Sequence, residues 1–281
     1  MSQEKIFEYF KVAVELVKEA GKIVKEAKNF EVERKEEVWD LVTVYDKKVE
    51  DILIEKLKGK YPDHDFIGEE ETYDKGHLAE LTDKPTWIID PIDGTANFVR
   101  KLPMSCISVG LTIQKDLVLG IVLNPFLDQL FTAIKGNGAY LNEKRIFTRK
   151  VNRIEQTNYN YELSLARAEK YRDLYLYRLS KIIAKAEGIR SLGSAALGLC
   201  YVACGQTDVY QCDGLSPWDA AAGVVIVREA GGFVCDTSEQ RLGLEFDVMK
   251  PNFMAAPNEN VAKEYLKLLK EADEERISKQ K

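Results

Sequence analysis

Two nearly continuous apolar runs separated by a short turn set the strongest limit on how this chain can fold. Residues 105–113 read SCISVGLTI and residues 117–123 read LVLGIVL, with Gln-Lys-Asp between them. Short apolar runs bounded by turn residues are typical of buried strands. A third run, Trp-Ile-Ile at 87–89, ends in Asp90 and has the same character. The sequence therefore predicts a sheet with a buried centre, which other layers must cover.

Segments with apolar residues three and four positions apart alternate with these strands. This spacing places the apolar side chains on one face of a helix. It predicts helices over residues 4–28, 46–57, 169–186, 193–203, 218–230 and from residue 260 into the tail. The alternation favours a mixed α/β (α+β) class of layered sheets and helices. We expect a single domain over residues 1–281, with an N-terminal half at about 1–148 and a C-terminal half at about 149–281.

The composition excludes several kinds of function. Lys and Arg number 40 and Asp and Glu 46 in 281 residues, a net charge of −6, which does not indicate a nucleic-acid partner. The two histidines, His64 and His77, are too few for a three-histidine or His-Glu-x-x-His zinc site, and both are expected in solvated loops. The five scattered cysteines predict no disulfide framework. Any metal chemistry must therefore use carboxylates and other hard oxygen ligands.

No segment indicates export or membrane insertion. The N-terminus carries a charge every few residues and lacks the apolar centre of a signal peptide. The longest apolar run, residues 220–227, is far shorter than the roughly 20 residues that span a bilayer. We expect a cytoplasmic protein without a membrane partner.

The most informative segment for chemistry is residues 87–100, WIIDPIDGTANFVR. Asp90 ends the apolar run, Asp93 follows three residues later, and Gly94 permits a tight turn before Thr95. Two carboxylates on one turn can converge on one point, where they repel each other unless a cation lies between them. Hard oxygen ligands suit Mg²⁺. The free amides of a helix that starts at Thr95 would favour a phosphate beside that metal.

Two further acidic positions agree with a metal site, although each has an ordinary explanation. Glu69 lies in a run of three glutamates that follows Gly68, and such a run is usually a solvated loop. Asp219 follows a tryptophan and precedes small residues at the start of a helix, where a negative charge is stabilising without any metal.

These segments resemble the inositol monophosphatase family, in order, over about residues 5–265. Residues 87–100 are similar to its first signature and residues 218–232 to its second. Gly68-Glu69-Glu70 resembles its acidic loop, and Lys35 with residues 40–46 resembles its N-terminal active-site segment. The resemblance implies the alternating αβαβα layers of the inositol monophosphatase and fructose-1,6-bisphosphatase type. It also implies a homodimer and Mg²⁺-dependent hydrolysis of a phosphate monoester that Li⁺ inhibits.

The resemblance also implies roles for individual residues. One Mg²⁺ is expected on Glu69, Asp90 and the Ile92 carbonyl oxygen, a second on Asp90, Asp93 and Asp219, and a weaker third near Glu69. The expected catalytic residues are Thr95 and Asp46, which would orient and deprotonate the attacking water, together with Glu69 and Asp90. Contacts to the phosphate or the rest of the substrate are expected at Lys35, Asp93, Gly94, Thr95, Gly193, Ser194, Ala195, Cys212 and Asp219.

The substrate side departs from the family pattern at two positions. Cys212 stands where the family carries a glutamate that binds ring hydroxyls, and Leu165 stands where a small hydroxyl residue is usual. A lost charge-assisted hydrogen bond corresponds to roughly 1.5–3 kcal/mol. The neighbouring Gln211 and Asp213 are candidates to compensate. The expected metal-binding and catalytic residues therefore match the family pattern better than the residues expected to bind the hydroxyl groups of a polyol.

Three functions remain open on this evidence. The first is an inositol monophosphatase, which the Asn97-Phe98 pair favours over nucleotide phosphatases. The second is a related phosphatase with another small substrate, such as a sugar phosphate or a phosphoadenosine nucleotide, although the modest chain length disfavours the nucleotide. The third is a weakly active dimeric paralogue that acts as a binding protein.

Overall fold

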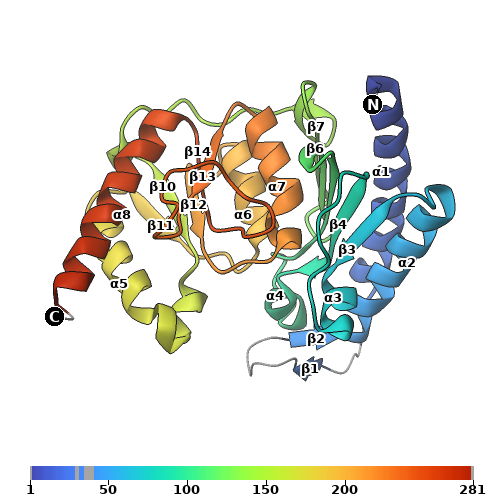
Figure 1. Ribbon diagram of the computed structural model, residues 1–281, viewed down its shortest axis with the longest axis horizontal. Coiled ribbons are helices and arrows are strands. Elements are labelled where there is room, and N and C mark those ends of the chain that lie inside the picture. Colours follow the sequence, from blue (N-terminus) through green and yellow to red (C-terminus); the bar gives the residue numbers. More distant parts are fainter. Residues whose placement is uncertain (1, 29–31, 35–40, 280–281) are drawn as a thin grey trace.

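Helices and sheets alternate in five layers in the computed structural model, which describes residues 2–28, 32–34 and 41–279 (Figure 1). From one side to the other the order is α1 (Gln3–Lys25) with α2 (Val44–Lys60), a larger sheet, α6 (Ala195–Ala203) with α7 (Pro217–Glu229), a smaller sheet, and α5 (Glu169–Ile183) with α8 (Glu259–Lys279). This αβαβα arrangement confirms the predicted fold class. Three buried apolar clusters fill the spaces between the layers.

The larger sheet has seven strands within the described residues. In spatial order they are β3 (Asp65–Gly68), β4 (Thr86–Asp93), β5 (Cys106–Ile113), β6 (Asp116–Asn124), β7 (Gln129–Ile134), β8 (Gly138–Leu141) and β9 (Lys144–Arg145). Only β3 and β4 pair in parallel among them, and the other neighbours are antiparallel. The two long apolar runs form the β5–β6 hairpin at the centre, as predicted.

The smaller sheet has five described strands, which the sequence patterns did not locate. In spatial order they are β11 (Gly188–Arg190), β10 (Asn158–Tyr161), β12 (Val209–Cys212), β14 (Phe253–Ala256) and β13 (Phe233–Asp236). Each has four residues or fewer, and β12 and β14 are buried throughout. A short strand that is buried on both faces has no alternating pattern to reveal it.

The helix α7 packs unusually close to the larger sheet. A side-chain carbon at Gly120 would lie 2.3 Å from the carbonyl oxygen of Ala222, and one at Gly110 would lie 2.8 Å from the Cβ of Ala221. At its first turn, the Ser108 hydroxyl of β5 donates to the Trp218 carbonyl oxygen at 3.2 Å. These contacts hold the first half of α7 against β5 and β6.

The short elements lie together at one end of the molecule (Figure 1). They are β1 (Val32–Arg34), β2 (Leu41–Thr43), α3 (Glu69–Lys75) and α4 (Thr95–Val99). Two 3₁₀ turns, Ile154–Gln156 and Leu163–Arg167, flank β10 in the second half. The strands of the larger sheet come from residues 65–145 and those of the smaller from 158–256, but α6 and α7 pack against the larger sheet. The division into halves at about residue 148 stays a prediction.

Local capping explains where helix ends differ from the prediction. The helix expected from residue 46 begins at Val44, because the Thr43 hydroxyl and the Asp46 carboxylate form a capping box. The helix expected from residue 193 begins at Ala195, because Gly193 has φ +72° and Ser194 caps the first turn.

The expected solvated loop is present at Pro62 and Asp63, which are exposed, but the His64 side chain is packed. The His64 ring stacks on Tyr61, its Nδ1 accepts from the Trp87 indole at 3.0 Å, and its Nε2 lies 3.2 Å from the Tyr9 hydroxyl. His77 is exposed, as expected. All five cysteines are free, which agrees with the absence of a disulfide framework. In the part of the chain that is described, no helix is long and apolar enough to cross a membrane.

Candidate active site

A bulge in β4 brings two carboxylates to the same side of the strand. Successive side chains of a regular strand alternate between faces, so residues 90 and 93 would point in opposite directions. In the pairing with β5, Asp90 faces Ser108 and Asp93 faces Cys106, so three steps on β4 match two on β5. The additional residue reverses the alternation. The predicted convergence of Asp90 and Asp93 therefore arises from a bulge within a strand that continues to Asp93, not from a turn after Asp90.

A third carboxylate reaches this point from the middle helical layer. Asp219 lies in the first turn of α7, where its carboxylate accepts from the Ser216 amide at 2.7 Å. One carboxylate oxygen each of Asp90, Asp93 and Asp219 lies within 4.8 Å of the others. The sequence places Asp219 more than 120 residues from the other two, so only the packing of α7 on the sheet unites them.

Asp93 also caps the helix α6. Its carboxylate accepts from the Ser194 hydroxyl at 2.5 Å and from the amides of Ala195 at 3.2 Å and Ala196 at 2.7 Å. These are the amides that lack partners within the helix. Ser194 and Ala195, expected to contact substrate, are thus held on Asp93 and do not line the cavity described below.

Asp46 and Thr95 meet beside the carboxylates, as predicted. The Thr95 hydroxyl lies 3.3 Å from an Asp46 carboxylate oxygen and 3.0 Å from the Ile92 carbonyl oxygen. Because the hydroxyl has one proton, it donates to only one of these acceptors at a time. Burial of the Asp46 carboxyl raises its pKa to about 7, although the Thr43 hydroxyl and amide bound to it oppose the shift.

Asp90 is the carboxylate of the cluster that is buried with one oxygen left without a hydrogen-bond donor among the described residues. Asp90 is 2% exposed, and its Oδ1 has no hydrogen-bond partner among the described residues. Burial, followed by the charges of the neighbouring carboxylates, holds the pKa of Asp90 well above its usual range. Burial also raises the pKa of Asp93, against the donors from Ser194 and α6. An orphaned carboxylate oxygen among further carboxylates fits a hard divalent cation such as Mg²⁺.

A cavity of about 530 Å³ opens onto these groups. Most of the predicted site residues line it, namely Glu69, Asp90, Ile92, Asp93, Gly94, Thr95, Gly193 and Asp219. Asp46 lies behind Thr95. Lys35 falls outside the described residues.

Gly94 can only be a glycine at its position in this wall. Its φ is +82°, and a side-chain carbon would lie 2.9 Å from the Met104 carbonyl oxygen and 3.0 Å from that of Gly193. The adjoining Asn97 amide donates to the Met104 and Leu192 carbonyl oxygens at 2.9 and 2.8 Å, which ties α4 to the second half of the chain. On the sequence alone, the Asn97-Phe98 pair favours an inositol substrate, but the Asn97 amide binds main-chain carbonyl oxygens of the protein itself.

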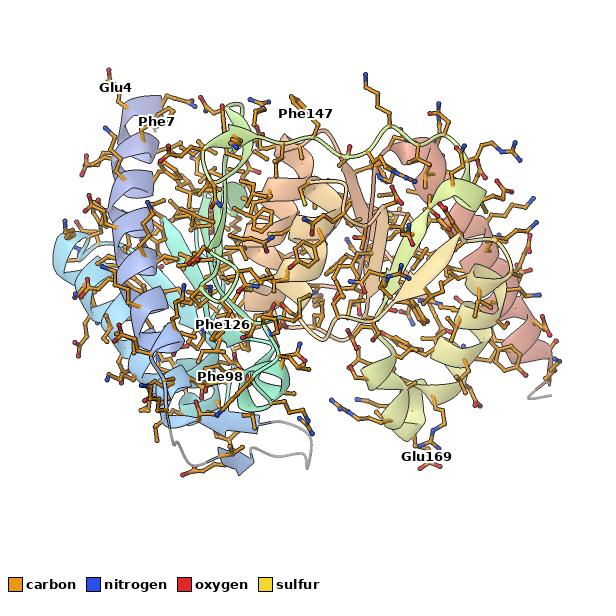
Figure 2. All side chains as sticks on the ribbon, turned by 180° about the vertical axis from the view of Figure 1, so that it is seen from behind. Glu4, Phe7, Phe98, Phe126, Phe147 and Glu169 are labelled. Carbon is orange, nitrogen blue, oxygen red and sulfur yellow. The ribbon has the colours of Figure 1, made fainter. Side chains whose placement is uncertain are left out.

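The apolar side chain of Phe98 also holds α4 in place, by packing in the core beside Phe126. Phe98 and Phe126 lie close together in the lower part of the view in Figure 2, with their ring centroids 6.3 Å apart. Phe98 is buried, so the helix that begins at Thr95 is packed on one face and faces the cavity with its first turn.

The structure does not bring Cys212 to the cavity. Cys212 is 1% exposed and is not among the cavity-lining residues. Gln211 and Asp213, expected as possible substitutes for a polyol ligand, are already engaged. Gln211 accepts from the Tyr159 hydroxyl and donates to Asp213, and Asp213 also binds the buried Arg178 guanidinium at 3.3 Å. The expected compensation is therefore wrong.

A different carboxylate, Glu162, lines the substrate side of the cavity and was not singled out from the sequence. It accepts from the hydroxyls of Ser164 at 2.6 Å and Ser191 at 2.9 Å and from the Gly193 amide at 2.9 Å. Leu165 contributes an apolar part of the same wall. Two of the partners of Glu162 lie about 30 residues along the chain, so no local spacing could have indicated it.

Comparison with known proteins agrees with this geometry. A model of the inositol monophosphatase family matches residues 6–274. Inositol monophosphatase 3 of Solanum lycopersicum is 44% identical over 267 residues, covering 94% of this chain and 97% of the relative. Inositol monophosphatase 1 of Homo sapiens is 39% identical over 270 residues, covering 94% and 96%. The solved structure of the Thermotoga maritima IMPase has a TM-score of 0.82 and 30% identity, covering 96% of this chain and 99% of that one. The chain therefore belongs to the inositol monophosphatase family.

Proposed function

We propose that this protein is a phosphoric monoester hydrolase that uses Mg²⁺ and acts on inositol monophosphate. The observation that carries the proposal is the convergence of Asp90, Asp93 and Asp219 within 4.8 Å, beside the Thr95–Asp46 pair at one cavity. Membership of the inositol monophosphatase family and the relatives named above support the same reaction.

The residues that would hold Mg²⁺ are Glu69, Asp90, the Ile92 carbonyl oxygen, Asp93 and Asp219. Bound there, Mg²⁺ would acidify a water molecule and neutralise negative charge on the phosphate and the leaving oxygen. Asp90 and Asp93 offer oxygens from two positions three residues apart on one strand, and Asp219 offers one from a separate helix. Such a set can hold two to three ions, and the number is part of the proposal.

Thr95 and Asp46 would handle the proton of the attacking water. The Thr95 hydroxyl can accept from that water while it donates to Asp46. A carboxyl with a pKa of about 7 accepts a proton readily at neutral pH. The Gly94 and Thr95 backbone lines the cavity and would bind phosphate oxygens at the start of α4. A supporting charge from Lys35 belongs to the same proposal.

A second candidate is a related phosphatase for another small phosphate monoester, such as a sugar phosphate. The buried Cys212 and the engaged Gln211 and Asp213 favour this candidate, because they leave few acceptors for ring hydroxyls. A phosphoadenosine nucleotide and a weakly active binding paralogue remain as outcomes of the same experiment.

Phosphate release from a panel of monoesters, with Mg²⁺, with EDTA and with added Li⁺, separates these functions. We expect Mg²⁺-dependent release from inositol monophosphate and inhibition by Li⁺. Faster release from a sugar phosphate or nucleotide would favour the second candidate. Absence of metal-dependent release from every ester would refute both.

The assembly and compartment are further parts of the proposal. We expect a cytoplasmic homodimer that binds a small phosphorylated metabolite, without a nucleic-acid or membrane partner. Light scattering of the purified protein at micromolar concentration measures the dimer directly, and a monomeric mass would refute it.

A further inference from the structure

The helix α3 begins at Glu69. The residue before it provides no side-chain cap for the helix N-terminus. Residue 68 before it is a glycine, which has no side chain to accept from the first amides. A carboxylate from another helix does so instead. The two oxygens of Glu50, on α2, accept from the amide of Glu70 at 2.9 Å and from that of Glu71 at 2.7 Å.

The local sequence is fitted to this arrangement. A side-chain carbon at Gly68 would lie 2.6 Å from the Glu50 carboxyl carbon and from one of its oxygens, so a residue with its own capping side chain cannot stand there. Glu50 is 2% exposed, and water has little access to take its place on these amides. A buried carboxylate that accepts two amide hydrogens at a helix N-terminus is both well satisfied and firmly placed.

The position of Glu50 on α2 connects it to the candidate site. Glu50 follows Asp46 by four residues, so both carboxylates lie on the same face of α2. Asp46 reaches Thr95, and Glu50 reaches the first turn of α3. Glu50 itself does not line the cavity, whereas Glu69 does.

We propose that Glu50 is a positioning residue, which fixes the first turn of α3 so that the Glu69 carboxylate is held at the metal site. This inference rests on the proposed function, in which Glu69 is a ligand of Mg²⁺. Groups that orient a metal ligand typically change metal affinity by 10–100-fold when they are replaced. Glu50→Gln preserves the volume but leaves one acceptor oxygen and turns an N–H group toward an amide that needs an acceptor.

The test measures Mn²⁺ binding to the full-length protein by electron paramagnetic resonance, together with the kinetics. For Glu50→Gln we expect Mn²⁺ affinity about 10-fold weaker or more, a similarly raised Mg²⁺ requirement, and a KM for the ester within about two-fold of wild type at saturating Mg²⁺. Glu55→Gln, an exposed glutamate on the same helix, is the matched control and should match wild type. Unchanged Mn²⁺ affinity in Glu50→Gln would overturn the proposal.

Hydrogen exchange of the wild-type protein tests the cap even if Glu50→Gln does not fold. The amides of Glu70 and Glu71 precede the first amide with a partner inside α3, so their protection reports the bond to Glu50. We expect them to exchange about 10-fold slower or more than in an unstructured peptide. Exchange at the unstructured rate would overturn the proposal.

Wild-type and Glu69→Gln measurements separate this inference from the proposed function. Absence of Mn²⁺ binding by wild type, or wild-type affinity in Glu69→Gln, would contradict the proposed ligand set. If Glu69→Gln weakens Mn²⁺ binding and Glu50→Gln does not, the proposed ligand set stands and only the positioning role of Glu50 is contradicted.

Discussion

Replacing Asp90 by asparagine should stabilise the metal-free protein while it abolishes the reaction. Asp90 is 2% exposed, one of its oxygens has no hydrogen-bond partner in the described chain, and its pKa is raised by burial and by neighbouring carboxylates. Without a cation, Asp90 must therefore either carry an unfavourable charge or take up a proton. An asparagine side chain has nearly the same shape as that of aspartate, and its amide can donate to a neighbouring carboxylate.

The magnitude follows from the spacing of the cluster. At 4.8 Å, two unit charges interact by about 3.5 kcal/mol for an effective dielectric constant of 20. Asp90→Asn removes the repulsion with Glu69, which is the largest, and those with Asp93 and Asp219. Partial protonation of the wild-type cluster already relieves much of the repulsion, so we expect a net gain of about 1–3 kcal/mol in the free energy of unfolding. For a chain of this size that is a rise in Tm of about 2–6 °C.

Scanning calorimetry in EDTA and again in excess Mg²⁺ checks this prediction, together with phosphate release. In EDTA Asp90→Asn should melt above wild type, whereas Mg²⁺ should stabilise wild type and leave the variant unchanged. Turnover should fall by about 100-fold or more. Asp51→Asn, at an exposed carboxylate on α2, is the control for loss of one negative charge. The reasoning fails if Asp90→Asn melts below wild type in EDTA or keeps a wild-type response to Mg²⁺.

Two further predictions concern the fold around the site. Gly120→Ala should lower the free energy of unfolding by about 2–3 kcal/mol, because the new methyl group would meet the Ala222 carbonyl oxygen of α7 at 2.3 Å. The control, Gly59→Ala, has open space within 4 Å and should gain about 0.5–1 kcal/mol, and equal urea midpoints for the two variants would contradict the close-packing argument. Burial lowers the pKa of His64 below its usual 6.5, so the imidazole of the unfolded chain becomes protonated before that of the folded chain as the pH falls. The free energy of unfolding should therefore decline below about pH 6.5, by at most about 1.4 kcal/mol per pH unit. Protonation also removes the acceptor for Trp87, so His64→Gln should lose this part of the pH dependence between pH 7.5 and 5.5, and an unaltered slope would count against it.

The strands that could be predicted are those whose apolar runs are long. The β5–β6 hairpin was located within one residue at each end, because seven and eight buried positions bounded by turn residues favour short strands over a helix. The strands of the smaller sheet could not be located, because four residues are compatible with several structures. The layered class was nevertheless predictable, since it depends on the alternation of elements and not on each strand.

In the candidate site, too, contacts between residues close in the sequence could be predicted, and contacts between distant residues could not. The convergence of Asp90 and Asp93 was predictable from their spacing around a proline, although its cause is a bulge. The partners of Asp93 at the start of α6 lie about 100 residues away, and two partners of Glu162 lie about 30 residues away, so these contacts depend on packing. The misjudged pair Gln211 and Asp213 shows the same limit. A buried arginine from α5 determines what Asp213 binds, and nothing near residue 213 in the sequence indicates it.

Four carboxylates of the candidate site, but not Asp90, lie at or bind a helix N-terminus. Asp46 and Asp219 close capping boxes on α2 and α7, Asp93 accepts the first amides of α6, and Glu69 is the first residue of α3. The starts of α2, α6 and α7 contribute amides without partners inside the helix, whose partial positive charge favours a carboxylate there. The fold can therefore assemble a site of like charges before any cation binds, and an incoming cation meets ligands that are already oriented. The same amides do not reach Asp90, which lies on a strand. In the proposed site Asp90 would therefore be the carboxylate that depends most on Mg²⁺, and its replacement should have the largest effect.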